Sequence, residues 1–134
     1  MTRKKEREQA FCLVFEKQFR NDSCEDIISL AGEIRDFEIT DYIKTSFSGV
    51  FDNINDINSL ISENLRGWDI SRLSKSCVSI LQLSVYELKY NGSVPEGVTI
   101  NEAVELAKKY CDEKEVPFLN GILGSIAGKL NTAC

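Results

Sequence analysis

The sequence of 134 residues contains no histidine. Histidine is the side chain that titrates nearest neutral pH, and it serves as general base, nucleophile activator and metal ligand. Its absence excludes histidine-based acid–base catalysis and histidine metal sites together. An enzyme that works with carboxylates or lysine alone is a minority interpretation, because no other motif specifies catalysis.

Cysteine motifs and nucleotide-binding loops are also missing. The five cysteines stand singly along the chain and form no CxxC pair, so neither a zinc site nor a thioredoxin-type site is expected. Most of them should be small apolar fillers, and Cys134 should be a free terminal thiol. No GxGxxG or GxxxxGK[ST] string occurs. The sequence thus predicts neither a metal nor a cofactor.

Long apolar runs are absent. No stretch approaches the roughly 18 to 20 consecutive apolar residues of a membrane span, and the charged N-terminus has no apolar run behind it. We therefore expect a cytoplasmic protein without a membrane partner. Only Pro95 and Pro117 interrupt the chain, which leaves long stretches free to be helical.

Charge is unevenly distributed along the chain. The first twenty residues carry six basic and three acidic groups, whereas the remainder carries ten and eighteen, a net charge of −8. A basic N-terminal end on an otherwise acidic chain indicates a small surface patch that binds phosphate groups. The other interpretation of that end is a frayed, solvated helix start. Cations at a helix N-terminus oppose the helix dipole, which favours an anionic ligand there.

Apolar residues recur at helical spacing nearly everywhere, and no segment alternates as a strand does. The spacing predicts helices over residues 3–20, 24–35, 40–65, 71–90, 100–110 and from 117 onward. In the third of these, apolar residues follow one another every three or four positions from Ile43 to Ile61, which predicts one long helix, bent near Gly49 or Asn53. The stripe also suits a dimer seam, but it is short, so packing within the monomer is favoured.

Two local signals mark the starts of the last helices. Thr99-Ile-Asn-Glu102 matches a capping box, in which the Thr hydroxyl accepts from the Glu amide, so a helix should start at Ile100. Pro117 suits the first turn of the final helix. We therefore expect an all-α fold in one compact domain over residues 1–134, made of two three-helix bundle halves, about 1–66 and 67–134.

The C-terminal third carries a longer motif. Val98-Thr-Ile-Asn-Glu-Ala-Val-Glu-Leu-Ala-Lys-Lys109 is followed by Pro117-Phe-Leu-Asn-Gly-Ile-Leu123, and Ile80-Leu-Gln-Leu-Ser-Val-Tyr-Glu-Leu88 precedes both. Together with the basic start Arg3-Lys-Lys-Glu-Arg7, these segments resemble the NusB family of transcription antitermination factors. The match is specific over residues 71–128 and looser over residues 1–66.

The resemblance implies a NusB-like fold of two three-helix bundles and a non-enzymatic, RNA-binding role. Members of the family bind the boxA element of ribosomal RNA transcripts as a heterodimer with the ribosomal protein NusE, and the complex joins elongating RNA polymerase to suppress termination. We expect the same partners here: boxA-like single-stranded RNA, NusE, the other Nus factors and RNA polymerase. The resemblance also allows a homodimer when the protein is unbound.

Carried over residue by residue, the resemblance implies phosphate contacts from the basic motif, Arg3, Lys4, Lys5 and Arg7. Phe15 occupies a position that is usually aromatic, and Phe118 is implied to stack on an unpaired base, with core burial as the alternative. Gln82 stands where the family commonly has arginine, and Cys77 where it commonly has a charged residue. The missing guanidinium at Gln82 would weaken RNA binding or shift its sequence preference.

Two other functions stay open on the sequence alone. One is a helical protein–protein adaptor whose basic tip binds no RNA. The other is a NusB-like ribosomal RNA-binding protein without antitermination activity, since a NusB-like domain also occurs in certain ribosomal RNA cytosine methyltransferases. Beyond the N-terminal motif we expect no second basic cluster, and Phe118 is the only exposed aromatic residue assigned to base stacking.

Overall fold

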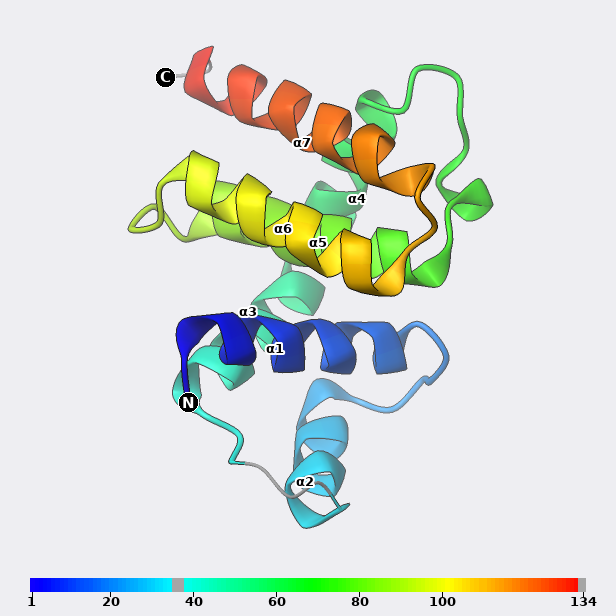
Figure 1. The fold of residues 1–134 in the computed structure, drawn as a ribbon. Helices are drawn as coiled ribbons and strands as arrows, with labels where there is room; N and C mark the ends of the chain where they lie inside the picture. Colours follow the sequence, from blue (N-terminus) through cyan, green and yellow to red (C-terminus); the bar gives the residue numbers. More distant parts are fainter. Residues whose placement is uncertain (35–37, 133–134) are drawn as a thin grey trace.

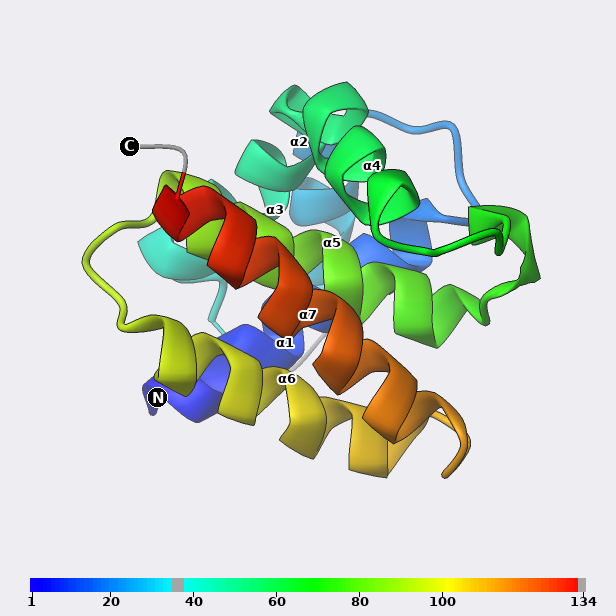
Figure 2. The ribbon, with the colours of Figure 1, turned by 90° about the horizontal axis from the view of Figure 1, so that it is seen from above.

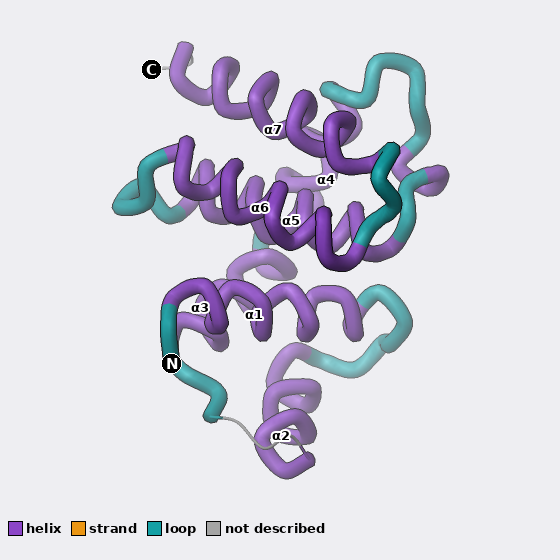
Figure 3. The backbone as a smooth tube through the Cα atoms, viewed as in Figure 1, coloured by secondary structure: helices purple, strands orange, loops and turns teal. Residues whose placement is uncertain are grey.

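The computed structural model describes residues 1–34 and 38–132, and the regular structure of this part is entirely helical (Figure 1; Figure 3). The elements in chain order are α1 (Arg3–Lys17), α2 (Cys24–Ile34), α3 (Asp41–Asp52), α4 (Ile54–Glu63), the 3₁₀ turn η1 (Ile70–Arg72), α5 (Lys75–Tyr90), α6 (Glu96–Tyr110) and α7 (Glu115–Thr132). The expected all-α fold is confirmed. In the described ranges, no helix is both long and apolar enough to span a membrane.

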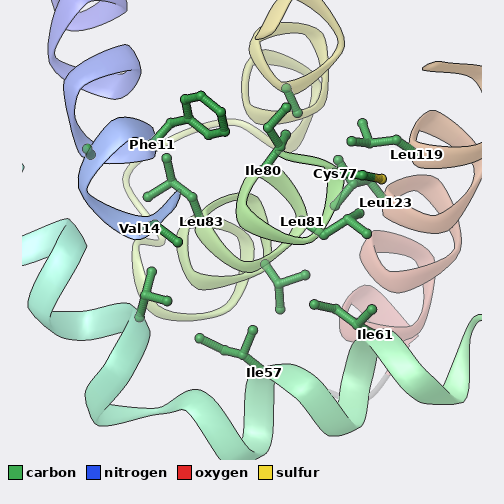
Figure 4. Packing of buried hydrophobic residues seen from close by; sticks show 14 of the residues in the cluster. Phe11, Val14, Ile57, Ile61, Cys77, Ile80, Leu81, Leu83, Leu119 and Leu123 are labelled. Atoms are coloured by element: carbon green, nitrogen blue, oxygen red, sulfur yellow. The ribbon is translucent and has the colours of Figure 1, made fainter. Parts of the chain in front are cut away.

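The fold is organised around α5, against which α1, α3, α4, α6 and α7 all pack (Figure 2). Ten of its sixteen residues are buried, because it has neighbours on most sides. Apolar side chains of α5 lie between those of α1, α4 and α7 in one continuous core (Figure 4). The labelled members of this core are Phe11, Val14, Ile57, Ile61, Cys77, Ile80, Leu81, Leu83, Leu119 and Leu123.

The single helix expected over residues 40–65 is wrong, because the chain breaks at Asn53 into α3 and α4. Asn53 has a non-helical backbone, with φ of −119° and ψ of 22°, and its side-chain amide donates to the carbonyl oxygen of Gly49 at 2.9 Å. Such a local hydrogen bond competes with the helical backbone ladder. The apolar stripe nevertheless continues through the break, so Phe47 on α3 and Ile57 on α4 both face the core.

Gly49 sets how closely α3 approaches α5. A Cβ atom built at this position would lie 2.2 Å from Cε1 of Tyr86, far inside van der Waals contact. Any larger residue would therefore push the Tyr86 ring or the whole helix aside. Of the two positions where a bend was expected, the chain breaks at Asn53, whereas Gly49 serves the packing of the two helices.

The capping box expected at Thr99 is also wrong. Helix α6 begins at Glu96, one turn earlier, with Pro95 as its N-cap residue. The fixed φ of Pro95, −60°, suits the entry into a helix and explains the early start. Thr99 therefore lies inside the helix, where it is buried and its Oγ1 has no hydrogen-bond partner among the described residues.

The starts of α1 and α2 and the ends of α5 and α6 agree with expectation, and the other helix ends differ by a few residues. Helix α1 ends at Lys17, and α5 begins only at Lys75, because the Ser74 hydroxyl caps it by accepting from the backbone N–H of Cys77 at 3.1 Å. Helix α7 begins at Glu115, so Pro117 lies in its first turn as expected. The predicted end of the second helix, residue 35, lies outside the described residues.

The cysteines are packed to different depths. Cys77 is buried in the core, whereas Cys12, Cys24 and Cys111 are half-buried, and none of these four forms a disulfide within the described residues. Burial raises the pKa of the Cys24 thiol, which keeps it protonated and unreactive near neutral pH. Cys134 lies outside the described residues.

Candidate nucleic-acid interface

The first turn of α1 presents three exposed cations, Arg3, Lys4 and Lys5. Thr2 begins the helix, and its hydroxyl accepts from the backbone N–H of Lys5 at 3.2 Å. The Arg3 guanidinium lies 4.0 Å from the centroid of the Tyr42 ring on α3, a cation–π contact that restrains it. These cations add to the positive end of the helix dipole, so an anion bound at this turn would be stabilised by both.

Arg7 differs from these three residues because its side chain is buried, with only 8% of its surface exposed. Its Nε lies 3.2 and 3.3 Å from the two carboxylate oxygens of Glu87 on α5, and its Nη2 donates to Oε1 at 2.7 Å. Burial by itself lowers the pKa of Arg7, but the hydrogen bond and charge of Glu87 outweigh it and raise that pKa. Arg7 therefore lies beneath the surface cations with which the sequence groups it, and its role in RNA binding stays a prediction.

A cleft of about 320 Å³ lies between α1 and α6. Its lining residues are Lys4, Arg7, Glu8, Glu102, Glu105, Leu106, Lys108 and Lys109. The fold brings Lys108 and Lys109 to the same cleft as Lys4, a proximity that the expectation of no second basic cluster did not include. Glu8, Glu102 and Glu105 offset part of this positive charge. Both lysine side chains on α6 are about 60% exposed.

Glu8 ties the end of α6 to α1. The ammonium group of Lys109 forms an ion pair with its carboxylate, and the Tyr110 hydroxyl donates to the same oxygen at 2.7 Å. The hydrogen bond from Lys109, and to a smaller extent that from Tyr110, holds the pKa of Glu8 below its usual range. Glu8 is consequently ionised at neutral pH and neutralises part of the positive charge. Lys108 in turn pairs with Glu105 at 3.6 Å, and both side chains of that pair stay exposed at the rim.

The opposite end of α1 carries a row of aromatic rings. Phe15 is half-buried, and its ring centroid lies 6.1 Å from that of Phe11 and 5.1 Å from that of Phe19. Phe19 is 63% exposed, and Tyr110 of α6 lies 4.8 Å from Phe11. These rings line an apolar groove of about 470 Å³, which Cys12 also borders. Phe15 thus lies in a surface groove at the junction of α1 and α6.

Gln82 is buried, with 3% of its surface exposed, and both ends of its side-chain amide are hydrogen-bonded. Its oxygen accepts from Nε2 of Gln18 at 2.7 Å, and its Nε2 donates to Oδ1 of Asn58 at 3.0 Å. The residue therefore links the end of α1 to α4 through α5. Gln82 therefore lies beneath the surface where an RNA-contacting side chain was expected, and its role in RNA binding stays a prediction.

Phe118 lies in the first turn of α7 and is half-buried. Its ring centroid lies 6.1 Å from that of Trp68, which belongs to the connection between α4 and α5. Core burial, the alternative considered for Phe118, is only partial. The helix buries Leu119 and Leu123 instead, so Phe118 stays at the surface beside the indole.

The basic turn and Phe118 are far apart. Figure 1 and Figure 2 both place the start of α1 and the start of α7 at opposite ends of the molecule, with α6 running between them. A ligand that touches both would have to bridge the two ends, and α6 is the helix that runs from one to the other. Within residues 1–34 and 38–132, no cluster of three or more cysteine and carboxylate side chains is arranged to hold a metal ion.

The sequence analysis did not single out four residues that border the cleft, the aromatic groove or Phe118. They are Lys108, Lys109, Phe19 and Trp68. The pair Lys108-Lys109 at the end of α6 can be read from the sequence, but only the fold brings it to the same cleft as Lys4. Trp68 is the single tryptophan of the chain, and an aromatic residue in a polar connection was a usable signal.

The sequence matches the model of the NusB family over residues 4–128. The transcription antitermination protein NusB of Clostridium botulinum (strain Alaska E43 / Type E3) is 42% identical to this chain, and the alignment covers 96% of the chain and all of that protein. The protein of the same name from Listeria monocytogenes serotype 4a is 41% identical, with 95% of this chain and 97% of that protein covered.

Solved structures are similar as well. T. maritima NusB superposes with a TM-score of 0.83 at 35% identity, covering 96% of this chain and 92% of that one. A crystal structure of the antitermination factors NusB and NusE in complex with double-stranded RNA matches with a TM-score of 0.82 at 28% identity. That match covers 96% of this chain and 99% of the other.

The buried position of Arg7 predicts a specific pattern of stability. Arg7→Ala leaves Glu87 buried without its cation, which should lower the free energy of unfolding by about 3 to 5 kcal/mol. Arg7→Met combined with Glu87→Met should recover most of that loss, because apolar side chains of similar volume replace both charges. Urea unfolding followed by circular dichroism measures both changes.

The matched control is Lys4→Ala, which removes an exposed cation from the same helix and should change the free energy of unfolding by less than about 0.5 kcal/mol. A loss in Arg7→Ala no larger than that in Lys4→Ala would contradict a structural role for the ion pair.

Proposed function

The chain belongs to the NusB family, and on this basis we propose that it is a non-enzymatic transcription antitermination factor. It binds boxA-type RNA of ribosomal RNA transcripts together with NusE and joins the other Nus factors on elongating RNA polymerase, in the cytoplasm. The observation that carries the proposal is a NusB-like fold over nearly the whole chain, which matches NusB in its complex with NusE and RNA. Residues 1–134 act as a single RNA-binding domain.

The phosphate contacts come from the exposed cations at one end of the cleft between α1 and α6. Arg3, Lys4 and Lys5 project from the first turn of α1, and Lys108 adds a fourth exposed cation on α6. Phosphate contacts of this kind fix the register of an RNA strand without reading its sequence. Arg7 acts indirectly, because its ion pair with Glu87 holds the basic turn against α5.

Base contacts come from the aromatic side chains that border the surface. Phe15 lies in the groove at the junction of α1 and α6, and Phe118 lies at the start of α7. Unpaired bases gain about 1 to 3 kcal/mol each by stacking on such rings. The buried Gln82 acts indirectly, because its hydrogen bond with Gln18 holds the end of α1 near the groove that contains Phe15.

The acidic body supports the need for a partner. Outside the first twenty residues the chain has a net charge of −8, which repels RNA but attracts a basic ribosomal protein. A docked basic partner would lengthen the phosphate-binding surface beyond the few cations of α1 and α6. The same charge pattern would serve a pure adaptor, so RNA binding has to be tested with and without the partner.

We expect NusE to raise the RNA affinity of this protein at least tenfold, about 1.4 kcal/mol of coupling free energy. By linkage, RNA should tighten the contact between the two proteins by the same factor. Titrating each component against the other two at fixed salt measures both effects, with a boxA-type RNA as the probe. Equal RNA affinity with and without NusE would contradict the assembly, and NusE binding without any RNA binding would favour the adaptor.

Salt dependence tests which cations meet phosphate. Each contact to single-stranded RNA should contribute about −0.7 to the slope of log affinity against log salt concentration, so Arg3, Lys4 and Lys5 together account for about −2. Lys4→Ala should reduce the slope by one such step, as measured by fluorescence anisotropy of labelled RNA.

The charge-matched control is Lys89→Ala on α5, where the lysine pairs with Asp56 of α4. It should leave the salt slope unchanged. Equal slopes for Lys4→Ala and the unsubstituted protein would locate the RNA away from the basic turn.

A further inference from the structure

The connection between α4 and α5 holds an indole at the surface. Trp68 is 56% exposed, although a large aromatic ring is ordinarily withdrawn from water. The two residues before it, Arg66 and Gly67, both have positive φ, 47° and 91°. For a residue with a side chain, such as Arg66, that conformation is uncommon and costs free energy. The chain therefore bends sharply just before the tryptophan.

The bend brings Trp68 against Phe118 without closing the space around them. The two ring centroids lie 6.1 Å apart, with the ring planes inclined by 58°. Hollows of about 450 and 310 Å³ adjoin the pair, and Trp68 and Phe118 line both of them. An arrangement that served only to shield Phe118 would fill these hollows, whereas here each ring keeps open space beside it.

Positive side chains border the same hollows. Arg66 lines the larger one, and Arg72 and Lys114 line the smaller one. The acidic neighbours have backbone partners: Glu115 accepts from the backbone N–H of Ser74 and of Asp112, and Asp69 caps η1. The aromatic pair therefore has cations at its edge, while the adjoining carboxylates are held by hydrogen bonds to the backbone.

We propose that Trp68 is a second base-stacking residue, which together with Phe118 holds unpaired bases of single-stranded RNA while Arg66, Arg72 and Lys114 contact the adjoining phosphates. The inference rests on the proposed RNA-binding function and extends it to the connection between α4 and α5. Aromatic platforms with flanking cations bind single strands with little sequence preference, because every base has a π-face. The RNA then passes from the basic turn of α1, along α6, to this site.

The chain offers a direct probe of the site. Trp68 is its only tryptophan, so intrinsic fluorescence excited at the indole reports on this residue alone. Titration with a boxA-type single-stranded RNA should quench the emission and protect it from acrylamide. The midpoint should coincide with that measured by the anisotropy of labelled RNA. The same RNA annealed to its complement should leave the emission unchanged at equal occupancy, since paired bases cannot stack on the indole.

Substitutions separate stacking from simple packing. Trp68→Ala should weaken single-stranded RNA binding about 5- to 150-fold, the range for losing one stacked base. Trp68→Tyr, which keeps an aromatic face, should stay within about threefold of the unsubstituted protein. Tyr90→Ala removes another exposed aromatic ring, on α5, and should leave RNA affinity unchanged. Because Trp68→Tyr and the fluorescence titration need no truncation, the test holds even if Trp68→Ala unfolds.

Three results would overturn the inference, and they differ from failure of the proposed function. RNA binding by anisotropy with unchanged Trp68 emission would remove stacking while leaving RNA binding intact. Stacking would also be ruled out if duplex RNA quenched the Trp68 emission as strongly as single-stranded RNA does. The same holds if Trp68→Ala bound RNA as tightly as the unsubstituted protein. Absence of RNA binding with and without NusE would overturn the proposed function itself, and this inference with it.

Discussion

The ion pair between Arg7 and Glu87 is the contact on which the placement of the basic surface depends. It joins α1 to α5, the helix that five others surround, and it is buried on both sides. Desolvating two charges offsets much of their attraction, so such a pair contributes geometry more than net stability. With Nε and Nη2 both engaged, the guanidinium fixes how α1 lies on α5 and therefore where residues 3–5 project.

Most of the helical architecture was predictable from the spacing of apolar residues, because burial against α5 imposes that spacing on five helices and burial against α1 and α3 imposes it on α2. Local signals were less reliable where tertiary contacts compete with them. The Thr99 capping pattern was overridden by Pro95, which starts α6 one turn earlier. A bend was expected near Asn53, but the complete break there depends on a side-chain hydrogen bond to Gly49, and the apolar stripe does not show it because the stripe runs through the break.

The candidate site was predictable only in part, since residue type does not reveal burial. Arg7 and Lys4 look alike in a basic run, yet only Arg7 meets a carboxylate on another helix. Gln82 resembles a surface amide until Gln18 and Asn58 occupy its hydrogen-bonding groups. Conversely, Lys108 lies in the same cleft as Lys4 because α6 packs beside α1. The two residues are about a hundred positions apart in the sequence, so no local pattern could predict that they are neighbours.

In the proposed mode of binding, exposed cations contact the RNA while the buried Arg7 only positions them. The most direct measurement is the RNA affinity of the variant in which Arg7→Met and Glu87→Met remove both charges of the pair, determined for protein shown to be folded by circular dichroism. We predict a salt slope equal to that of the unsubstituted protein, together with a loss of affinity that is the same at every salt concentration, because the basic turn is held less firmly against α5. A slope reduced by about 0.7 would place Arg7 on a phosphate and contradict its indirect role.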